Sequence, residues 1–220
     1  MLDYEVDPAV LSDRVPTGVA LDLFEGRALV TVVGFRFLAT RVLGLAVPGH
    51  RDFDEVNLRF YVRRELPGGE VRRGVTFVRE LVPRLAIALV ARAAFNEPYR
   101  AVPMRHSVVA DRRSYEWRTG GRWQGVSATT VGAPAVPPAG SREAFVTQRH
   151  WGYTRQRDGR TIEYEVKHDL WRVWRAESPR LAADVATLWG DAFVPALSAP
   201  PLGALVAEGS AVTVSAPRWM

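Results

Sequence analysis

Turn-forming dipeptides recur along the whole chain and divide it into short segments. The segments between them are rich in Val, Phe, Tyr, Trp and Thr, and apolar residues alternate with polar ones. This pattern is typical of antiparallel hairpins. It predicts an α+β fold that is mainly β. The turns are Glu25-Gly26, Pro67-Gly68-Gly69, Gly120-Gly121, Asp158-Gly159 and Glu208-Gly209.

The segment "NLRFYVRR", residues 57–64, shows the alternation most clearly. Leu58, Phe60 and Val62 share one strand face, so we expect that face to pack and the other to carry polar groups. Aromatic residues in such strands bury large areas, so we expect them in the core rather than on a stacking platform for bases or sugars. These aromatics are Trp117, Trp123, Trp151, Tyr153, Tyr164, Trp171 and Trp174.

Helix signals are fewer than strand signals. We expect four helices, over residues 7–15, 82–95, 141–149 and 178–190, each from a cap or proline near its start. The Pro/Gly-rich stretch 132–140 reads as a loop, which we expect at a rim or as a lid.

Length and charge bound the class of protein. At 220 residues, with no linker-like stretch, a single domain over 1–220 is expected. The net charge is +5, but Lys167 is the only lysine, and the arginines are spread among 24 acidic residues without a basic run. We therefore expect no nucleic-acid partner. A codon preference for arginine explains the charge.

Several kinds of site are not indicated. The chain has no cysteine, and His50, His106, His150 and His168 do not pair at metal-ligand spacing. It also lacks a phosphate-binding glycine loop and a serine nucleophile elbow. We expect no metal and no cofactor. No signal-peptide pattern and no long apolar run occurs, which favours a cytoplasmic protein without a membrane partner.

One polar grouping lies on a predicted strand. Glu55, Asn57, Arg59, Tyr61 and Arg63 share strand parity. Alternation alone favours a solvated outer face, because a two-faced antiparallel sheet predicts it. The alternative is the polar wall of an enclosed cavity, with Glu55 as acid or base and Arg59 binding an anion.

A second grouping follows the longest helix. In "FNEPYRAVPMRH", residues 95–106, Glu97, Tyr99, Met104 and His106 would lie at a cavity mouth, where loops and element ends carry function. A capped helix end with Met104 as core filler explains the same residues equally well.

Longer stretches resemble a known family. The segments "YEVDPAVLSDRVPTGVALDLFEGRALVTVVGFRFLATRVLG", "HRDFDEVNLRFYVR", "FNEPYRAVPM" and "HWGYTRQRDGRTIEYEVKH" look like the YqjF-like bacterial family, a conserved domain of unknown function. The resemblance covers nearly the whole chain, in order. Members of that family have additional residues before the first segment, so it implies that this chain starts late.

That family is in turn remotely similar to acetoacetate decarboxylase. The similarity implies a closed, cone-like antiparallel β-barrel around a cavity, with a few peripheral helices. Phe53-Asp54-Glu55 looks like the decarboxylase's aromatic-x-Glu element, which makes Glu55 a cavity carboxylate. Residues 96–99 look like its lysine element, but Tyr99 stands where the Schiff-base lysine would be.

This departure excludes the decarboxylase mechanism at that position, since tyrosine cannot form an imine. Lys167 is not expected to substitute. Glu163 and Glu165 share its strand face, and their negative charge favours the ammonium form. We expect Lys167 on a solvated strand face.

Three functions remain open. The first is binding of a small organic molecule, with a carboxylate as the group that suits Arg59. The second is an enzyme acting on a small oxo or carboxylic substrate, a lyase or isomerase without a Schiff base. The third is an interaction protein whose barrel is packed solid. Candidate catalytic residues are Glu55, Tyr99 and His106, and candidate ligand-binding residues are Asn57, Arg59, Tyr61, Glu97 and Met104.

Overall fold

The structure is a computed structural model that describes residues 1–42, 45–46 and 51–220. His50, which begins one of the family-like segments, lies outside the described residues. Among those residues, no helix is long and apolar enough to cross a membrane.

Strands dominate the described chain, as the turn spacing predicts. The strands are β1 Leu2–Val6, β2 Ala20–Leu21, β3 Ala28–Phe37, β4 Arg41–Val42, β5 Leu45–Ala46, β6 Phe53–Glu65, β7 Val71–Val82, β8 Tyr99–Ala101, β9 Met104–Val109, β10 Arg112–Thr119, β11 Arg122–Ala135, β12 Trp151–Arg155, β13 Thr161–Lys167, β14 Val173–Ala182, β15 Gly203–Ala207, β16 Thr213–Val214 and β17 Arg218–Trp219. The α-helices are α1 Pro8–Leu11, α2 Leu85–Phe95, α3 Arg142–Thr147, α4 Val185–Trp189 and α5 Val194–Ser198. The prediction of a mainly β fold with few helices is confirmed.

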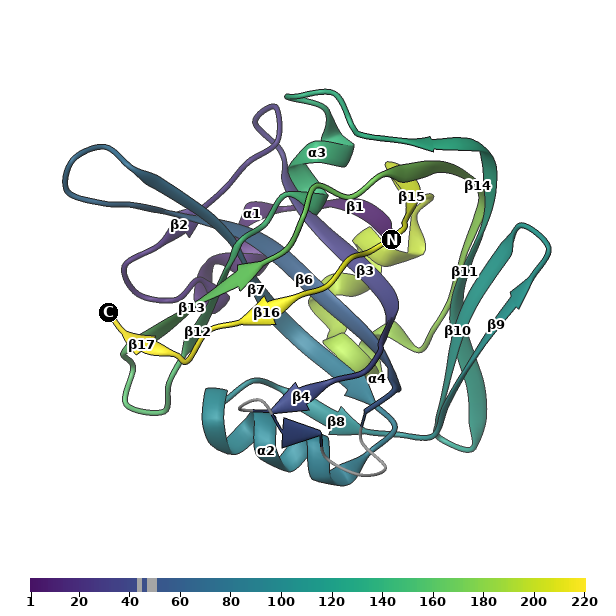
Figure 1. Cartoon of the computed structure of the whole chain (residues 1–220), viewed down its shortest axis with the longest axis horizontal. Helices are drawn as coiled ribbons and strands as arrows, with labels where there is room; N and C mark the ends of the chain where they lie inside the picture. The colour runs from purple at the N-terminus through teal and green to yellow at the C-terminus, as the bar shows by residue number, and fades with distance from the viewer. Residues whose placement is uncertain (43–44, 47–50) are drawn as a thin grey trace.

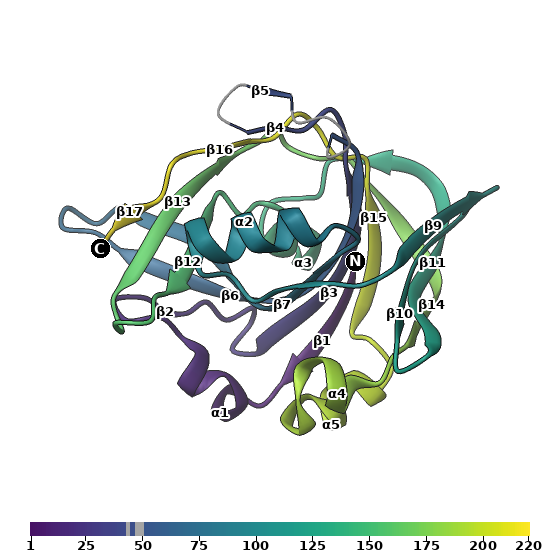
Figure 2. The ribbon, with the colours of Figure 1, turned by 90° about the horizontal axis from the view of Figure 1, so that it is seen from below.

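Fifteen strands form one sheet in the order β16-β13-β12-β7-β6-β3-β1-β15-β14-β11-β10-β9, with β2, β8 and β17 paired off this path. The sheet curls around a central space, with α2 across one end and α1, α4 and α5 on the outside (Figures 1 and 2). All pairs are antiparallel except β7 with β8 and β7 with β12, which are parallel. The strand order has two ends, β16 and β9, so the described hydrogen bonding does not close the sheet, and closure of the barrel stays a prediction.

The predicted hairpins form where the glycines allow a left-handed backbone. Gly68 and Gly69 have φ of +103° and +88°, and they join β6 to β7. Gly159 has φ of +86° and joins β12 to β13. Only glycine adopts such values without strain, so these positions fix the hairpin ends.

The two faces of β6 differ in what they meet. Val56, Leu58, Phe60 and Val62 are fully buried in the main apolar cluster, which also contains residues of α1, α4 and α5. The opposite face of β6 looks into the space that the sheet encloses (Figure 2). Both faces are therefore buried, and β6 is a central strand with a polar inner side.

Three of the four predicted helices are present. Asp7 and Ser141 cap α1 and α3 as expected, each accepting a backbone N–H. Asn96 ends α2 in the left-handed conformation. The fourth prediction is wrong over 178–182, because β14 continues to Ala182, pairing with β11 on both sides of Ser178. The helix there is α4, which Asp184 caps.

Two further expectations need correction. Residues 132–135 of the predicted loop belong to β11, where Ala135 pairs with Val173. Trp123 is 41% exposed rather than in the core, and the Arg105 guanidinium stacks over its ring at 4.1 Å. Trp117, Tyr153 and Tyr164 are buried as expected. Trp151, Trp171 and Trp174 are only partly buried.

Candidate functional site

Four polar residues of β6, Glu55, Asn57, Arg59 and Tyr61, lie on its inner face and are withdrawn from solvent. Arg63, which shares their parity, has a side chain that is 43% exposed and lies beside Glu65. Glu55, Asn57 and Tyr61 are 2%, 2% and 1% exposed, and Arg59 is partly buried among them. Asn57 donates a hydrogen bond of 2.9 Å to Glu55 Oε1. A solvated outer face, which alternation alone favours, is therefore wrong for these residues. The curled sheet covers the side that a flat sheet would leave in water.

Three glutamates and two tyrosines meet Asn57 on this inner face. Tyr99 donates 3.0 Å to Glu55 Oε2, and Thr154 donates 3.2 Å to Glu97 Oε1. Tyr164 also donates to Glu97 Oε1. β6, β7, β8 and β13, with the turn after α2, bring these groups together. We call this set the interior cluster: Glu55, Asn57, Glu80, Glu97, Tyr99 and Tyr164.

Glu80 is a residue that sequence reasoning missed. It is 1% exposed and pairs directly with Asn57 across β6 and β7. Beyond this pair the register shifts, because Leu58 faces Arg79 while Arg59 faces Phe77. This bulge switches the parity of β7, so that Glu80 and Phe77 share the inner face. A bulge leaves no mark in the alternation of a single strand, so the sequence signal was absent.

Burial sets the protonation of the three glutamates. Desolvation raises the pKa of Glu55 to about 7, against the lowering effect of hydrogen bonds from Asn57 and Tyr99. Desolvation also raises the pKa of Glu80 well above its usual range, with Glu97 and Glu55 adding to the effect. The pKa of Glu97 is raised by burial, but hydrogen bonds from Tyr164, Glu80 and Thr154 oppose the shift. Burial and the neighbouring carboxyl groups thus favour the protonated form of Glu80, which suits it to donate a hydrogen bond to Glu97.

The interior cluster contains the groups that general acid–base catalysis needs. A carboxyl group with a pKa near 7 exchanges protons readily at neutral pH. The pKa of Tyr99 is raised well above 10 by burial and by the neighbouring Glu55 charge, so its hydroxyl stays a donor. Within the described residues, no three His, Cys, Asp or Glu side chains are arranged to hold a metal ion.

Arg59 brings a positive charge to the same face. Its Nη2 donates 2.8 Å to the Val146 carbonyl of α3, which fixes the guanidinium. Its Nε is buried and has no partner among the residues that the structure describes. The same holds for Asn57 Oδ1 and Glu80 Oε2. Three unpaired polar atoms of neighbouring side chains therefore lie on one face of β6 and β7.

A second polar group supports the Arg59 end of the face. Thr31 Oγ1 lies 2.5 Å from Tyr61 Oη and donates 2.8 Å to Asp3 Oδ1. Arg142 Nη1 donates 2.7 Å to Asp3 Oδ2. These contacts satisfy Tyr61 and neutralise Asp3. Arg59 is left as the inner cation whose buried Nε is unpaired within the described chain.

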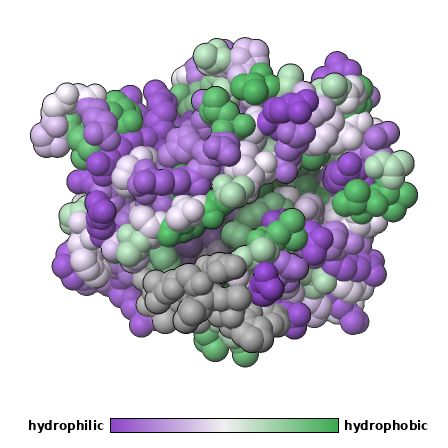
Figure 3. All heavy atoms as spheres, in the orientation of Figure 1, coloured by the Kyte–Doolittle hydropathy of each residue, from purple (hydrophilic) through white to green (hydrophobic). Residues whose placement is uncertain are grey.

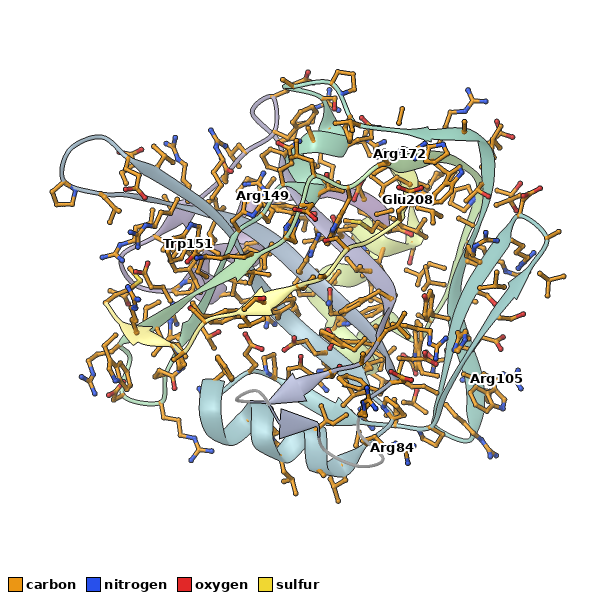
Figure 4. All side chains as sticks on the ribbon, viewed as in Figure 1. Arg84, Arg105, Arg149, Trp151, Arg172 and Glu208 are labelled. Carbon is orange, nitrogen blue, oxygen red and sulfur yellow. The ribbon has the colours of Figure 1, made fainter. Side chains whose placement is uncertain are left out.

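Arg149 anchors the chain between α3 and β12. Its Nη1 donates 2.5 Å to Asp22 Oδ2, and both side chains are almost fully buried, at 3% and 4% exposure. Its guanidinium stacks at 3.9 Å from the Phe145 ring centroid, beside α3 (Figure 4). This ion pair joins the segment after β2 to the segment between α3 and β12, beside Tyr61.

Two predicted site residues lie elsewhere. Met104 packs against the main apolar cluster on the other side of β6, so it is core filler. His106 Nδ1 lies 2.9 Å from Asp54 Oδ1. Asp54 and Glu55 are successive strand residues and point to opposite faces, which separates His106 from the interior cluster. The structure joins Glu55, Asn57, Glu97 and Tyr99 in one cluster, with Arg59 and Tyr61 beside it on the same face.

Lys167 lies outside the site, on the solvated face expected for it. Its side chain is 70% exposed, and its Nζ is 3.5 Å from Glu165 Oε2. The solvated face is shorter than predicted, because Glu163 is buried and receives hydrogen bonds from Arg64 and Arg72.

The face seen in Figure 1 is hollowed beside the residues drawn in grey, and apolar side chains lie in the hollow (Figure 3). Polar residues surround it on the same view. An apolar recess with a few polar groups is the usual form of a small-molecule site.

A family model and a bacterial relative match most of the chain. A family model, DUF2071, described as an uncharacterized conserved protein, matches residues 1–211. The uncharacterized protein YqjF of Bacillus subtilis (strain 168) is 29% identical over 180 residues, which make up 80% of this chain and 72% of YqjF. The resemblance stated from the sequence is confirmed.

Solved structures share the fold at low identity. Acetoacetate decarboxylase from Legionella pneumophila has a TM-score of 0.67 at 14% identity, over all of this chain and 82% of its own. The enduracididine biosynthesis enzyme MppR complexed with pyruvate has a TM-score of 0.66 at 17% identity, over 99% of this chain and 86% of its own. An acetoacetate decarboxylase-like enzyme from Sphingomonas wittichii RW1 has a TM-score of 0.62 at 12% identity, over 100% of this chain and 88% of its own. At these identities, the similarity to the solved structures shows the fold alone.

Proposed function

The chain belongs to the DUF2071 family of uncharacterized conserved proteins, and from that premise we propose that it binds a small carboxylate-bearing organic molecule on the inner face of its curled sheet. Arg59 binds the carboxylate, and Asn57, Glu55 and Tyr99 orient the rest of the molecule.

One observation carries the proposal. Asn57 Oδ1, Arg59 Nε and Glu80 Oε2 are buried without a partner among the described residues, and they belong to neighbouring side chains of one face. A buried polar group without a hydrogen bond costs about 1–3 kcal/mol. Three such groups side by side are costly for a purely structural interior. A bound molecule would satisfy all three, which supports binding over a barrel packed solid.

The structural neighbours support the class of ligand. MppR, on the same fold, is seen with pyruvate, a small oxo acid. Arginine is well suited to a carboxylate, because its planar fork matches the two oxygens. The apolar side chains seen in the hollow would take the remainder of such a molecule.

Isothermal titration calorimetry with pyruvate, acetoacetate, lactate and propionate tests the proposal. We expect binding to the wild type and a loss of at least about 100-fold in Arg59→Met, because a charged hydrogen bond in a buried site is lost. Glu65→Gln is the matched control. Glu65 lies on the same strand with the same parity, but its side chain is 66% exposed. Equal binding by Arg59→Met would contradict the role of Arg59.

A second candidate function has its own observation. The pKa of Glu55 is about 7, and Tyr99 donates to the same carboxyl group. These two groups suit proton transfer next to a carbonyl, with Tyr99 stabilising an enolate. The reaction would be of lyase or isomerase type, without an imine. Exchange of the C3 protons of pyruvate in D2O, followed by proton NMR, detects it; Glu55→Gln would abolish that exchange.

We propose that residues 1–220 form one domain whose sheet closes into a barrel around the ligand. The protein would work in the cytoplasm without nucleic acid, membrane, metal or cofactor.

A further inference from the structure

The unpaired atoms of the interior cluster differ in chemical kind, and the difference describes the ligand. Asn57 Oδ1 is an acceptor. Glu80 Oε2 is also an acceptor, whether the carboxyl group is ionised or carries its proton on the other oxygen. Arg59 Nε is a donor only. The ligand must therefore supply a hydrogen-bond donor for Asn57 and Glu80, and a hydrogen-bond acceptor for Arg59.

The two unpaired acceptors lie next to each other. Asn57 and Glu80 are directly paired across β6 and β7. Side chains so paired have Cβ atoms about 5 Å apart. Both residues are almost fully buried, at 2% and 1% exposure, so no bulk water reaches these oxygens. A single N–H-bearing group between them would satisfy both.

Three carboxyl groups gather at the same place. Glu55, Glu80 and Glu97 are all buried there; the charge of Glu97 disfavours ionisation of Glu55 and Glu80, and the charge of Glu55 disfavours ionisation of Glu80. A cation bound among them would offset that repulsion. An ammonium group, with three donors and a positive charge, meets both requirements, whereas a carbonyl or hydroxyl group supplies fewer donors and no charge.

The acceptor pair and the donor are close enough for one small molecule. Asn57 and Arg59 are two residues apart on one strand, which places them about 6.6 Å apart along it. With hydrogen bonds of about 2.9 Å on each side, this separation matches two neighbouring polar groups of one molecule. An ammonium and a carboxylate on the same or adjacent carbons fit this spacing.

We infer that the ligand is an amino acid, whose carboxylate pairs with Arg59 and whose ammonium group donates to Glu80 and Asn57. The inference rests on the proposed function and narrows its ligand from carboxylates in general to zwitterions. An analogue without the amino group leaves two buried acceptors unpaired. Sites of this kind reject the analogue that lacks the donor by at least about 100-fold.

Matched acids that differ only at the second carbon test the inference. Calorimetry would compare alanine, lactate, pyruvate and propionate, and then leucine with its hydroxy and oxo analogues. We expect one amino acid of the two series to bind at least about 100-fold more tightly than its analogues. Similar binding by all members overturns the amino-acid inference and leaves the proposed function standing. Binding by none of them overturns both.

The number of protons taken up or released on binding gives an independent test, because its sign differs between amino acids and simple carboxylates. An ammonium group lowers the pKa of Glu55 and Glu80, so amino-acid binding near pH 7 releases protons. A simple carboxylate at Arg59 raises the pKa of Glu55, so its binding takes protons up. Calorimetry in phosphate and in Tris separates these signs, because the two buffers differ in ionisation enthalpy. Proton uptake with an amino acid would overturn the inference.

Variants locate the ammonium site. Glu80→Gln keeps the side-chain volume but replaces the carboxyl group, which an ammonium ligand would ionise, by a neutral amide, and we expect the preference for the amino acid to fall at least about tenfold. Asn57→Ser removes one acceptor and is the second variant, should Glu80→Gln not fold. Glu65→Gln keeps the wild-type preference. An unchanged preference in both Glu80→Gln and Asn57→Ser overturns the assignment.

Discussion

The Tyr99 hydroxyl donates a hydrogen bond of 3.0 Å to Glu55 Oε2 inside the curled sheet. From the sequence, we expect Tyr99 where the acetoacetate decarboxylase family carries its reactive lysine. A neutral donor thus stands beside a buried carboxyl group, instead of an amine that could form an imine. The pair can position a ligand or pass a proton, but it cannot hold a substrate covalently as a Schiff base.

Replacing Tyr99 by phenylalanine should raise the pKa of Glu55 above about 7. The tyrosine hydrogen bond favours the carboxylate, so its loss favours the protonated form. Carbon-13 NMR of the glutamate side-chain carboxyls, followed against pH, measures the shift. Tyr115→Phe serves as the control, because Tyr115 lies near Asp54 on the other side of β6. A Glu55 pKa that stays or falls in Tyr99→Phe would show that the hydrogen bond does not act on it.

Borohydride treatment in the presence of pyruvate or acetoacetate should leave Lys167 unmodified. The side chain is 70% exposed and its Nζ lies 3.5 Å from Glu165 Oε2, so it lacks the desolvated pocket or neighbouring cation that activates a Schiff-base lysine. Peptide mapping by mass spectrometry locates any adduct, and Lys167→Arg is the control. A reduced adduct on Lys167 in the wild type would reverse the dismissal of imine chemistry.

The stability of the fold should depend on the ionisation of Glu55. Its pKa rises on folding, from 4.5 to about 7, so its contribution is complete below about pH 4.5 and is lost as the pH rises through 7. The shift corresponds to about 3 kcal/mol of unfolding free energy. Urea denaturation between about pH 5 and pH 9 should therefore show the wild type losing stability relative to Glu55→Gln.

The exposed Glu65→Gln variant should follow the wild type across that pH range. A constant difference in unfolding free energy between the wild type and Glu55→Gln would mean that Glu55 titrates normally in the folded state.

Breaking the buried ion pair between Asp22 and Arg149 should lower the free energy of unfolding substantially. Asp22→Asn leaves the Arg149 charge uncompensated among Phe145 and Tyr61, and such changes cost about 3–5 kcal/mol. The exposed pair of Arg175 and Glu177 is the matched comparison, with side chains 73% and 57% exposed. Glu177→Gln should change the unfolding free energy by less than about 1 kcal/mol. Equal costs in urea denaturation for the two variants would refute the structural role of the buried pair.

Local chemistry in the sequence was enough to predict much of the fold. The turn residues Gly68-Gly69 and Asp158-Gly159 favour turns in any β-rich context, and Asp7 and Ser141 are strong helix caps. The prediction failed at residues 178–182. There Ser178 before Pro179 looks like a helix start, but pairing of β14 with β11 continues through it. Tertiary pairing overrode a local signal.

The site was only partly predictable, for two physical reasons. Parity grouped Glu55, Asn57, Arg59 and Tyr61 on one face, but it could not tell whether that face was inside or outside. That depends on how far the sheet curls. The bulge opposite Leu58 brought Glu80 to the same face, and a single strand's pattern carries no trace of it. Met104 and His106 were misplaced because β9 presents them to the other side of β6.

Mass spectrometry of small molecules that co-purify with the native protein tests the central claim most directly. The account predicts a carboxylate-bearing molecule in roughly stoichiometric amount, released by denaturation and absent from Arg59→Met prepared in the same way. The same molecule should be retained by Glu65→Gln. Native protein that releases no small molecule and binds none of the acids added back would contradict the account, and would favour an interior that serves only to hold the fold.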